Sequence, residues 1–278
     1  LMTNLYDGQN IYFDYSQIRL EGARLRTMGG RASGPAPLIK LHDFIRETMH
    51  NAQGRKLTTL EAHDICNQIA EIVVVGGVRR SSQISLSDLD DKEMRHAKEW
   101  PFPIKRAMAN NSAIFREKPS AAQFLKEWAS LALSGTGERG IFNLNAAQNR
   151  APSRRYAPLI QGTNPCGEIM LRDMEFCNLS EVVIRAEDDL DSLLDKVETA
   201  TWLGVIQSTF TYFPYLRESW KKNCDVERLL GVSLTGQMDN PSLLTSECLK
   251  ALKSRVLRIS RKAAKVLGIK VPVATTCV

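Results

Sequence analysis

The sequence predicts an α/β fold, and three observations support this class. Several segments of the 278-residue chain place apolar residues at the period of an amphipathic helix. Short β-branched or alternating runs lie between these segments. No internal repeat, low-complexity tract or long linker divides the chain. Because alternating strands and helices are joined by helical crossovers, we expect parallel strands.

Two helices are predicted in the first third of the chain. The first covers 37–52 and follows the Gly/Pro-rich loop GGRASGPAPL. The second begins after Thr58 or Thr59 and includes Cys66, which we interpret as a buried structural thiol. The isoleucines expected on one side of this second helix are Ile65, Ile69 and Ile72.

The next elements are marked by glycines and by a capping serine. Gly76 and Gly77 are expected to stop the second helix. Two short strands are then predicted, SSQISLSDL at 81–89 and NNSAIF at 110–115. A helix follows, with Ser120 as its N-cap and Gly135 beyond its end. The segment GTGERGIFN at 135–143 is expected to be a turn-rich connector.

The last third of the chain again alternates helices with strands. The predicted elements are a long helix at 190–212, a buried strand at 229–237, an amphipathic helix at 242–268 and a final strand at 271–278.

Composition and charge exclude several classes of protein. With 43% apolar and 24% charged residues, the chain has the composition of a soluble globular protein, and no apolar run reaches the length of about 18 residues that spans a membrane. The net charge of +6 is spread over helix faces, which does not indicate a nucleic-acid groove.

Cysteine and histidine usage favours a reducing cytoplasm without a metal site. The six cysteines lack the dense spacing of a secreted disulfide scaffold. No CxxC occurs, and the four histidines are scattered, so we expect no structural metal.

The stretch NPCGEI carries the candidate chemistry. In an extended segment Asn164, Cys166 and Glu168 would project from one edge. Pro165 and Gly167 favour a loop tip over a sheet ladder. A turn with a packed cysteine remains the alternative.

The absence of a nearby histidine in the sequence bears on the reaction type. A cysteine hydrolase needs a histidine base, and no histidine follows His96. A thiol with a carboxylate and an amide, without an imidazole, instead suits radical chemistry at sulfur.

Several motifs of the chain resemble those of a known protein family. GTNPCGEI, FCNLSEV, GGRASGPAPL, VVVGGVRRSS, ANNSAIF, SGTGERGIFN and GVSLTGQMD together resemble the adenosylcobalamin-dependent (class II) ribonucleotide reductases, in their monomeric ribonucleoside-triphosphate reductase branch. The resemblance implies a ten-stranded α/β barrel with the radical cysteine on an inner finger loop. Residues 1–278 would then be part of that barrel domain, truncated at both ends.

The resemblance also implies roles for four residues. Cys166 would carry the thiyl radical that takes hydrogen from C3′ of the ribose. Glu168 would be the base for the 3′-hydroxyl, and Asn164 would bind the ribose hydroxyls. Cys177, eleven residues after Cys166, would be one of two reducing cysteines. The other would lie on an early strand before Leu1.

Residues 73–118 resemble the effector and specificity loops of the family. Arg79 or Arg80 in VVVGGVRRSS would bind the phosphates of a deoxynucleotide effector. The segment AKEWPFPIKRAM would occupy the place of the specificity loop. Solvated arginines after a glycine stop, and an ordinary packed turn, remain the alternatives.

The implied cofactor and partners rest on the resemblance alone. Adenosylcobalamin would supply the radical, although no D-x-H-x-x-G signature occurs in the chain. The partners would be a ribonucleotide substrate, a deoxynucleotide effector, thioredoxin or a similar dithiol acting through a segment beyond Val278, and the flanking segments themselves. We therefore expect the chain to be inactive alone.

Two alternative functions remain open. One is a class I reductase large subunit, whose radical arrives from a partner. The other is a non-catalytic nucleotide-binding fragment of a split gene product.

Overall fold

The computed structural model describes residues 1–26, 30–72, 74–75, 79–80, 82–273 and 275–276. The chain forms two compact units, unit 1 (Leu1–Asn143) and unit 2 (Leu144–Val278). Within the described ranges, no helix has the length and apolar character needed to cross a membrane.

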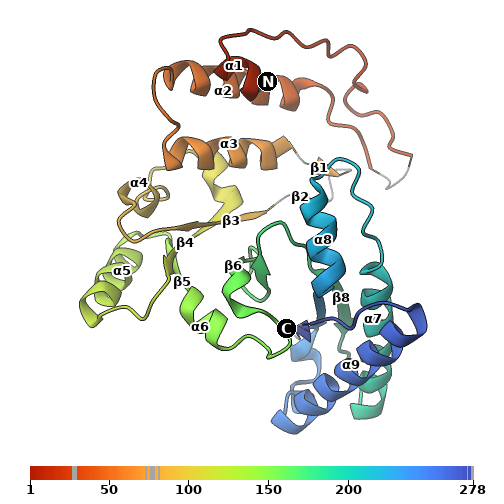
Figure 1. Ribbon diagram of the computed structural model, residues 1–278. Helices are drawn as coiled ribbons and strands as arrows, with labels where there is room; N and C mark the ends of the chain where they lie inside the picture. The colour runs from red at the N-terminus through yellow and green to blue at the C-terminus, as the bar shows by residue number, and fades with distance from the viewer. Residues whose placement is uncertain (27–29, 73, 76–78, 81, 274, 277–278) are drawn as a thin grey trace. The chain divides into compact units, whose positions relative to one another are not determined.

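Unit 1 combines a helical pair with a small parallel sheet (Figure 1). Its helices are α1 (Met2–Tyr6), α2 (Ala36–Asn51), α3 (Thr59–Ile72), α4 (Lys92–Arg95) and α5 (Ala121–Leu133). Its strands are β1 (Val74–Val75), β2 (Arg79–Arg80), β3 (Gln83–Ser87), β4 (Ala109–Phe115) and β5 (Gly140–Asn143). Strands β3, β4 and β5 are parallel neighbours in that order, whereas β1 and β2 pair antiparallel.

The two helices predicted in the first third are confirmed, with one stripe residue wrong. α2 and α3 pack through Leu41, Ile45 and Ile65. Ile69 is 42% exposed, because the stripe that α3 buries is too narrow to include it. Cys66 is exposed as well, which corrects its interpretation as a buried thiol.

The helix predicted after residue 120 is confirmed as α5. The Ser120 side chain accepts a hydrogen bond from the Gln123 backbone, and the Gln123 side chain accepts one from the Ser120 backbone. This capping box satisfies two amide groups that the first helical turn leaves free. Gly135, beyond the helix end, has a φ of +72°.

The predicted connector at 135–143 is partly wrong, because its last four residues form strand β5. β5 pairs in parallel with β4, with Gly140 opposite Ser112. A Cβ at Gly140 would lie 3.0 Å from the Ser112 hydroxyl, so glycine allows this close pairing. The predicted stop at Gly76 and Gly77 lies outside the described residues.

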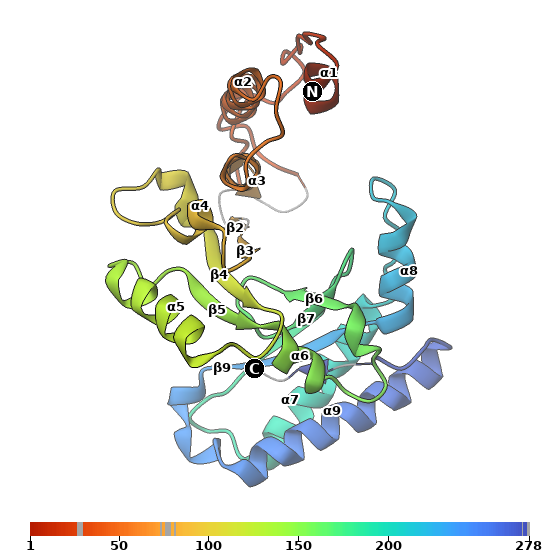
Figure 2. The same cartoon turned by 60° about the vertical axis from the view of Figure 1, so that its left-hand side comes forward.

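Unit 2 contains a second parallel sheet and an antiparallel hairpin (Figures 1 and 2). Its helices are α6 (Leu144–Asn149), α7 (Leu190–Gln207), α8 (Glu218–Glu227) and α9 (Ser246–Leu267). Its strands are β6 (Ile160–Thr163), β7 (Met170–Arg172), β8 (Asn178–Val183), β9 (Leu230–Thr235) and β10 (Thr275–Thr276). The sheet order is β10, β9, β8, all parallel, and β6 pairs with β7.

The core of unit 2 lies between this sheet and the helix pair α7 and α9, which run side by side in Figure 1. The buried core residues contributed by the two helices include Leu193, Val197, Val205, Leu252, Val256 and Ala263. Asp189 caps α7, Thr245 caps α9, and Gly268 ends α9 in the left-handed conformation. These helix predictions are confirmed, although α7 ends at Gln207 and not at 212, and α9 begins at Ser246 and not at 242.

The expectation of parallel strands is confirmed in both units. Strand β8 and helix α8 were not predicted from the sequence. In the part of the chain that the structure describes, no sheet has more than three strands and none closes. The structure therefore shows a mixed α/β architecture and does not show the expected ten-stranded barrel.

Replacing Leu193 with alanine tests the core of unit 2. Leu193 is fully buried under the sheet, so we expect a loss of about 2–5 kcal/mol in the free energy of unfolding. Urea denaturation measures this loss, followed by fluorescence of Trp202 and Trp220 after Trp100 and Trp128 are changed to phenylalanine. The matched control is Leu203→Ala on the same helix, where the side chain is 60% exposed and the expected change is below about 0.5 kcal/mol. Equal losses in the two variants would contradict the assigned core.

Candidate active site

The segment NPCGEI forms the tip of the β6–β7 hairpin (Figure 2). The Asn164 amide donates to the Ile169 carbonyl at 3.2 Å, and the Gly167 amide donates to the Asn164 carbonyl at 3.0 Å. Gly167 has a φ of +87°, a conformation that side chains with a Cβ resist. The segment is therefore a closed turn, so the expectation of an extended edge with alternating side chains is wrong.

The turn nevertheless brings the amide and the carboxylate together. Asn164 Nδ2 donates to Glu168 Oε1 at 2.6 Å, and Asn164 Oδ1 accepts from the Ile169 amide at 3.0 Å. The other carboxylate oxygen of Glu168, Oε2, is buried and has no hydrogen-bond partner among the described residues. A buried acceptor without a partner is costly, so this oxygen is available to a donor from a bound molecule.

Cys166 and Cys177 occupy different environments. Cys166 is an exposed free thiol in the hairpin turn. Cys177 is partly buried immediately before β8, and burial, with the negative charges of Glu168 and Glu175, raises the pKa of its thiol to about 12. The positive charge of Arg155 acts in the opposite direction without offsetting the rise.

Gly231 in β9 makes room for Cys177 beside the hairpin. A Cβ at Gly231 would lie 3.7 Å from Cys177 Sγ and 3.4 Å from Ile169 Cδ1. It would also lie 2.4 Å from Leu179 Cδ2, closer than packed carbon atoms approach. The absence of a side chain at Gly231 therefore allows the hairpin and Cys177 to pack on the same point of the sheet.

A cavity of about 420 Å³ adjoins the hairpin. Its walls come from α6, the segment after α6, the hairpin and the start of β9. Glu168 contributes an acidic group to its lining, Arg150 and Arg155 contribute basic groups, and Ile160, Met170 and Leu230 contribute apolar surface. The acidic side chain of the hairpin turn therefore lines this cavity, whereas Cys166 is exposed and is not among the lining residues.

A buried ionic cluster behind the site was missed by sequence reasoning. We name it the Arg155 cluster, and its members are Arg155, Arg172, Glu175 and Glu227. Burial and a hydrogen bond with Glu227 raise the pKa of Glu175 to about 8. Glu175 lies between the motifs GTNPCGEI and FCNLSEV, whereas Arg155 and Glu227 lie outside them and carry no local signal.

The candidate effector residues lie in unit 1. Arg79 and Arg80 form β2, opposite Val75 and Val74. In the proposed specificity segment, Arg106 donates to both carboxylate oxygens of Asp64 at 2.7 and 2.8 Å. The guanidinium of Arg106 is therefore occupied by an ion pair with Asp64 of α3.

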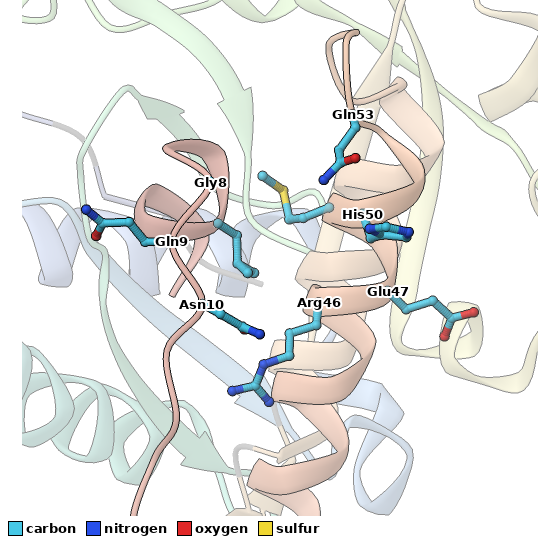
Figure 3. Close-up of a pocket in the computed structure, with 9 residues that line it drawn as sticks. Gly8, Gln9, Asn10, Arg46, Glu47, His50 and Gln53 are labelled. Carbon is cyan, nitrogen blue, oxygen red and sulfur yellow. The ribbon is translucent and has the colours of Figure 1, made fainter.

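A second cavity, of about 440 Å³, lies in unit 1 between residues 8–10 and α2 (Figure 3). Its lining is mixed: Asn10, Arg46, Glu47 and His50, labelled in the figure, are polar, whereas Leu5 and Met49 are apolar. Arg46 is engaged by the Ile11 carbonyl and by Asp43. No cysteine lines this cavity, so it does not reproduce the chemistry at the hairpin.

The described residues offer no recognisable set of ligands for a metal ion or for cobalamin. No group of three histidine, cysteine or acidic side chains is arranged to hold a metal ion in the described ranges. Unit 2 has no histidine that could ligate cobalt, since none follows His96, and the histidines of unit 1 form no such group with other ligands in the described ranges. We therefore assign no cobalamin-binding residue in this chain.

Taken together, the parallel strands and the hairpin define an α/β protein with a two-cysteine site in which an amide and a carboxylate accompany the exposed thiol. The family profile described as "Ribonucleotide reductase, barrel domain" matches residues 78–239, and the chain belongs to this family.

Individual relatives agree with this membership. The chain is 34% identical over 244 residues to the adenosylcobalamin-dependent ribonucleoside-triphosphate reductase of Lactobacillus delbrueckii subsp. bulgaricus (strain ATCC BAA-365), covering 85% of this chain and 32% of that protein. It is 33% identical over 244 residues to the protein of the same name from Lactobacillus leichmannii, with the same coverage. The chain thus spans about a third of the length of these relatives.

The environments of the two thiols predict unequal reactivity. At pH 8, we expect iodoacetamide to modify Cys166 at least about 100 times faster than Cys177. Cys177 is partly buried, and with a pKa of about 12 only about one molecule in 10⁴ carries its reactive thiolate. Trypsin separates the two cysteines into peptides 156–172 and 173–185, so mass spectrometry measures both rates in one sample. Similar rates would show that the Cys177 environment is wrongly assigned.

The raised pKa of Glu175 predicts a pH-dependent stability. The folded state retains a proton up to a pH of about 8, whereas a carboxyl with the ordinary value of 4.5 releases it in the unfolded state. The contribution of Glu175 to stability should therefore be highest below pH 4.5, fall as the pH rises, and level off above about 8. The change Glu175→Gln removes this proton and should flatten the slope.

Urea unfolding of unit 2 from pH 5 to 9, in the two-tryptophan background defined above, measures this slope. The control is Glu218→Gln, at an exposed position on α8, which should keep the wild-type slope. An unchanged slope in Glu175→Gln would contradict the raised pKa.

Proposed function

We propose that this chain is part of the catalytic barrel of a reductase that converts ribonucleotides, as triphosphates, to deoxyribonucleotides for DNA synthesis. The observation that carries the proposal is the hairpin turn itself. It places an exposed thiol beside an amide and a carboxylate that are bonded to each other, and the carboxylate keeps one buried oxygen free of partners. Membership of the reductase family gives this arrangement its reaction class.

Each of the four site residues has a proposed role. Cys166, as a thiyl radical, takes the hydrogen atom from C3′ of the ribose. Glu168 accepts the proton of the 3′-hydroxyl, so that the 2′-hydroxyl can leave as water. Asn164 holds both the carboxylate and the sugar in place. Cys177 and a second cysteine, which the resemblance places on an earlier strand, give two electrons and end as a disulfide.

The cofactor and partners belong to the same proposal. Adenosylcobalamin, the cofactor in the names of the relatives, supplies the initial radical when it is bound. Arg79 and Arg80 bind the phosphates of a deoxynucleotide effector within residues 73–118, and thioredoxin or a similar dithiol restores the cysteine pair. The free thiols of the described residues suit the reducing cytoplasm.

Two alternative functions fit the observations less well than this proposal. A class I large subunit would carry similar site residues, but the relatives reported above are named as adenosylcobalamin-dependent enzymes. A non-catalytic nucleotide-binding fragment would have no need of a carboxylate oxygen buried without a partner.

The test is a chimera in which this chain replaces the matching third of the reductase from Lactobacillus leichmannii. With adenosylcobalamin, a ribonucleoside triphosphate and dithiothreitol, we expect deoxynucleotide formation. Cys166→Ser should abolish it, and Glu168→Gln should lower kcat about 10²–10⁴-fold, the usual contribution of a general base. The rate of deoxynucleotide formation, measured by chromatography, reports both effects.

The unmodified Lactobacillus reductase is the positive control. Cys66→Ser is the matched cysteine control, since this exposed thiol lies in unit 1 and should leave the rate unchanged. A folded chimera that binds nucleotide but forms no product, or one whose activity survives Cys166→Ser, would refute the proposed function.

A further inference from the structure

Arg155 makes the shortest ion pairs of the Arg155 cluster. It is almost fully buried, and its guanidinium reaches three partners from different parts of unit 2. Nη1 donates to the Met170 carbonyl at 2.6 Å, and Nη2 lies 2.9 Å from Glu175 Oε2 and 2.8 Å from Glu227 Oε2. One side chain therefore joins the hairpin, the segment before Cys177 and the end of α8.

On the hairpin side, the bond reaches the backbone of the reactive turn. Met170 is the first residue of β7 and directly follows Ile169, whose amide is held by the Asn164 side chain. The Arg155 bond to the Met170 carbonyl therefore fixes the start of the strand that follows the turn containing Glu168.

On the other side, Glu175 controls the segment that leads to Cys177. The carboxylate oxygen that binds Arg155 also accepts a hydrogen bond from the Arg172 amide at 3.1 Å. This closes a short turn over 172–175, in which Met174 has a φ of +51°. Because Cys177 follows two residues later, the position of Glu175 sets where β8 begins.

Helix α8 supports this turn from outside. Asn223 Nδ2 donates to the Asp173 carbonyl at 2.8 Å, and Trp220 stacks on Phe176 with ring centroids 4.6 Å apart. These contacts hold the turn against α8, but they do not reach the hairpin. Arg172, the last residue of β7, also has its Nε 3.4 Å from Glu175 Oε1, and Arg155 adds a link from outside both cysteine-bearing segments.

We propose that Arg155 is a positioning residue that couples the Cys166 hairpin to the segment carrying Cys177, and so keeps the two thiols at a fixed separation. Its role in catalysis rests on the proposed function. The coupling needs the planar guanidinium, which donates in several fixed directions at once, whereas a lysine ammonium retains the charge without this fork.

The experiment compares the wild-type chain with Arg155→Lys by two readouts. The first is iodoacetamide modification of Cys177 in peptide 173–185, and the second is amide hydrogen exchange of the hairpin peptide 156–172. We expect Arg155→Lys to speed both by about tenfold or more. Cys248, buried in the core of unit 2, reports global opening and should change less than about twofold.

The matched control is Arg154→Lys at the neighbouring position. Arg154 is exposed and donates to the Pro272 carbonyl, outside the Arg155 cluster, so neither readout should change. If Arg155→Lys does not fold, Glu227→Gln replaces it, because that change weakens both arginine contacts at nearly constant side-chain size.

The outcomes separate coupling from a general structural role. A response of both the hairpin and Cys177, without Cys248, supports the proposal. A response of only one of them, of neither, or of Cys248 to the same extent overturns it.

Neither readout requires nucleotide or cofactor, so this result is independent of the chimera test. If the chimera is inactive but the hairpin and Cys177 both respond to Arg155→Lys, the proposed function is refuted and the structural role of Arg155 is retained. In an active chimera, Arg155→Lys should lower kcat with little change in KM for the nucleotide.

Discussion

Parallel pairing of β8 with β9 is the constraint on which the rest of unit 2 depends. The two strands match over six residues, from Asn178 opposite Leu230 to Val183 opposite Thr235. Because parallel strands cannot be joined by a tight turn, the chain between them must cross over through helices, and α7 and α8 supply that crossover. The pairing also fixes the height of Cys177, one residue before β8, against Gly231 in β9. The hairpin then packs at a place that the sheet has already determined.

The charges near the thiols show how burial and pairing compete. Two glutamates and two arginines are buried together in the Arg155 cluster, and removing one partner from such a group typically costs about 3–5 kcal/mol. Burial still dominates at Glu175, whose pKa rises although an arginine lies 2.9 Å away. The cluster therefore contributes less to stability than four ideal ion pairs would. The main effect of the cluster is to fix the relative positions of three segments, because Arg155 contacts the Met170 carbonyl, Glu175 and Glu227.

Much of the fold could be predicted from the sequence, because long amphipathic helices carry repeated evidence. α2 and α9 each present several turns of apolar spacing. α2 has a proline in its first turn, and α9 has a capping threonine at its start and a glycine at its end. β8 was missed because its six residues include Asn178 and Glu181 and resemble a catalytic motif more than a strand. α8 was missed because its polar composition offers almost no apolar stripe. Whether a short segment forms a helix or a strand depends on the residues it packs against in the fold, and these cannot be read from a single sequence.

The site shows the same limit at the scale of side chains. The sequence identified Asn164, Cys166 and Glu168 as a group, but for the wrong geometric reason. Alternation along an extended strand would have placed all three side by side, whereas the turn bonds Asn164 to Glu168 and leaves Cys166 exposed. Arg155 could not be found at all, because a buried arginine is recognised by its partners, and these lie up to 72 positions away in the sequence.

The contrast between the two thiols follows from placement alone. Cysteine has one intrinsic chemistry, yet Cys166 in a hairpin turn meets solvent while Cys177 is enclosed by β9 and by two carboxylates. A thiol held in its protonated form at neutral pH is a poor nucleophile, and so resists alkylation and unwanted disulfide exchange. A protonated thiol can still donate its hydrogen atom, or be oxidised, when a reacting group contacts it. An exposed thiol and a protected thiol on neighbouring segments thus differ in reactivity, and the difference holds only while the surroundings of Cys177 keep their positions.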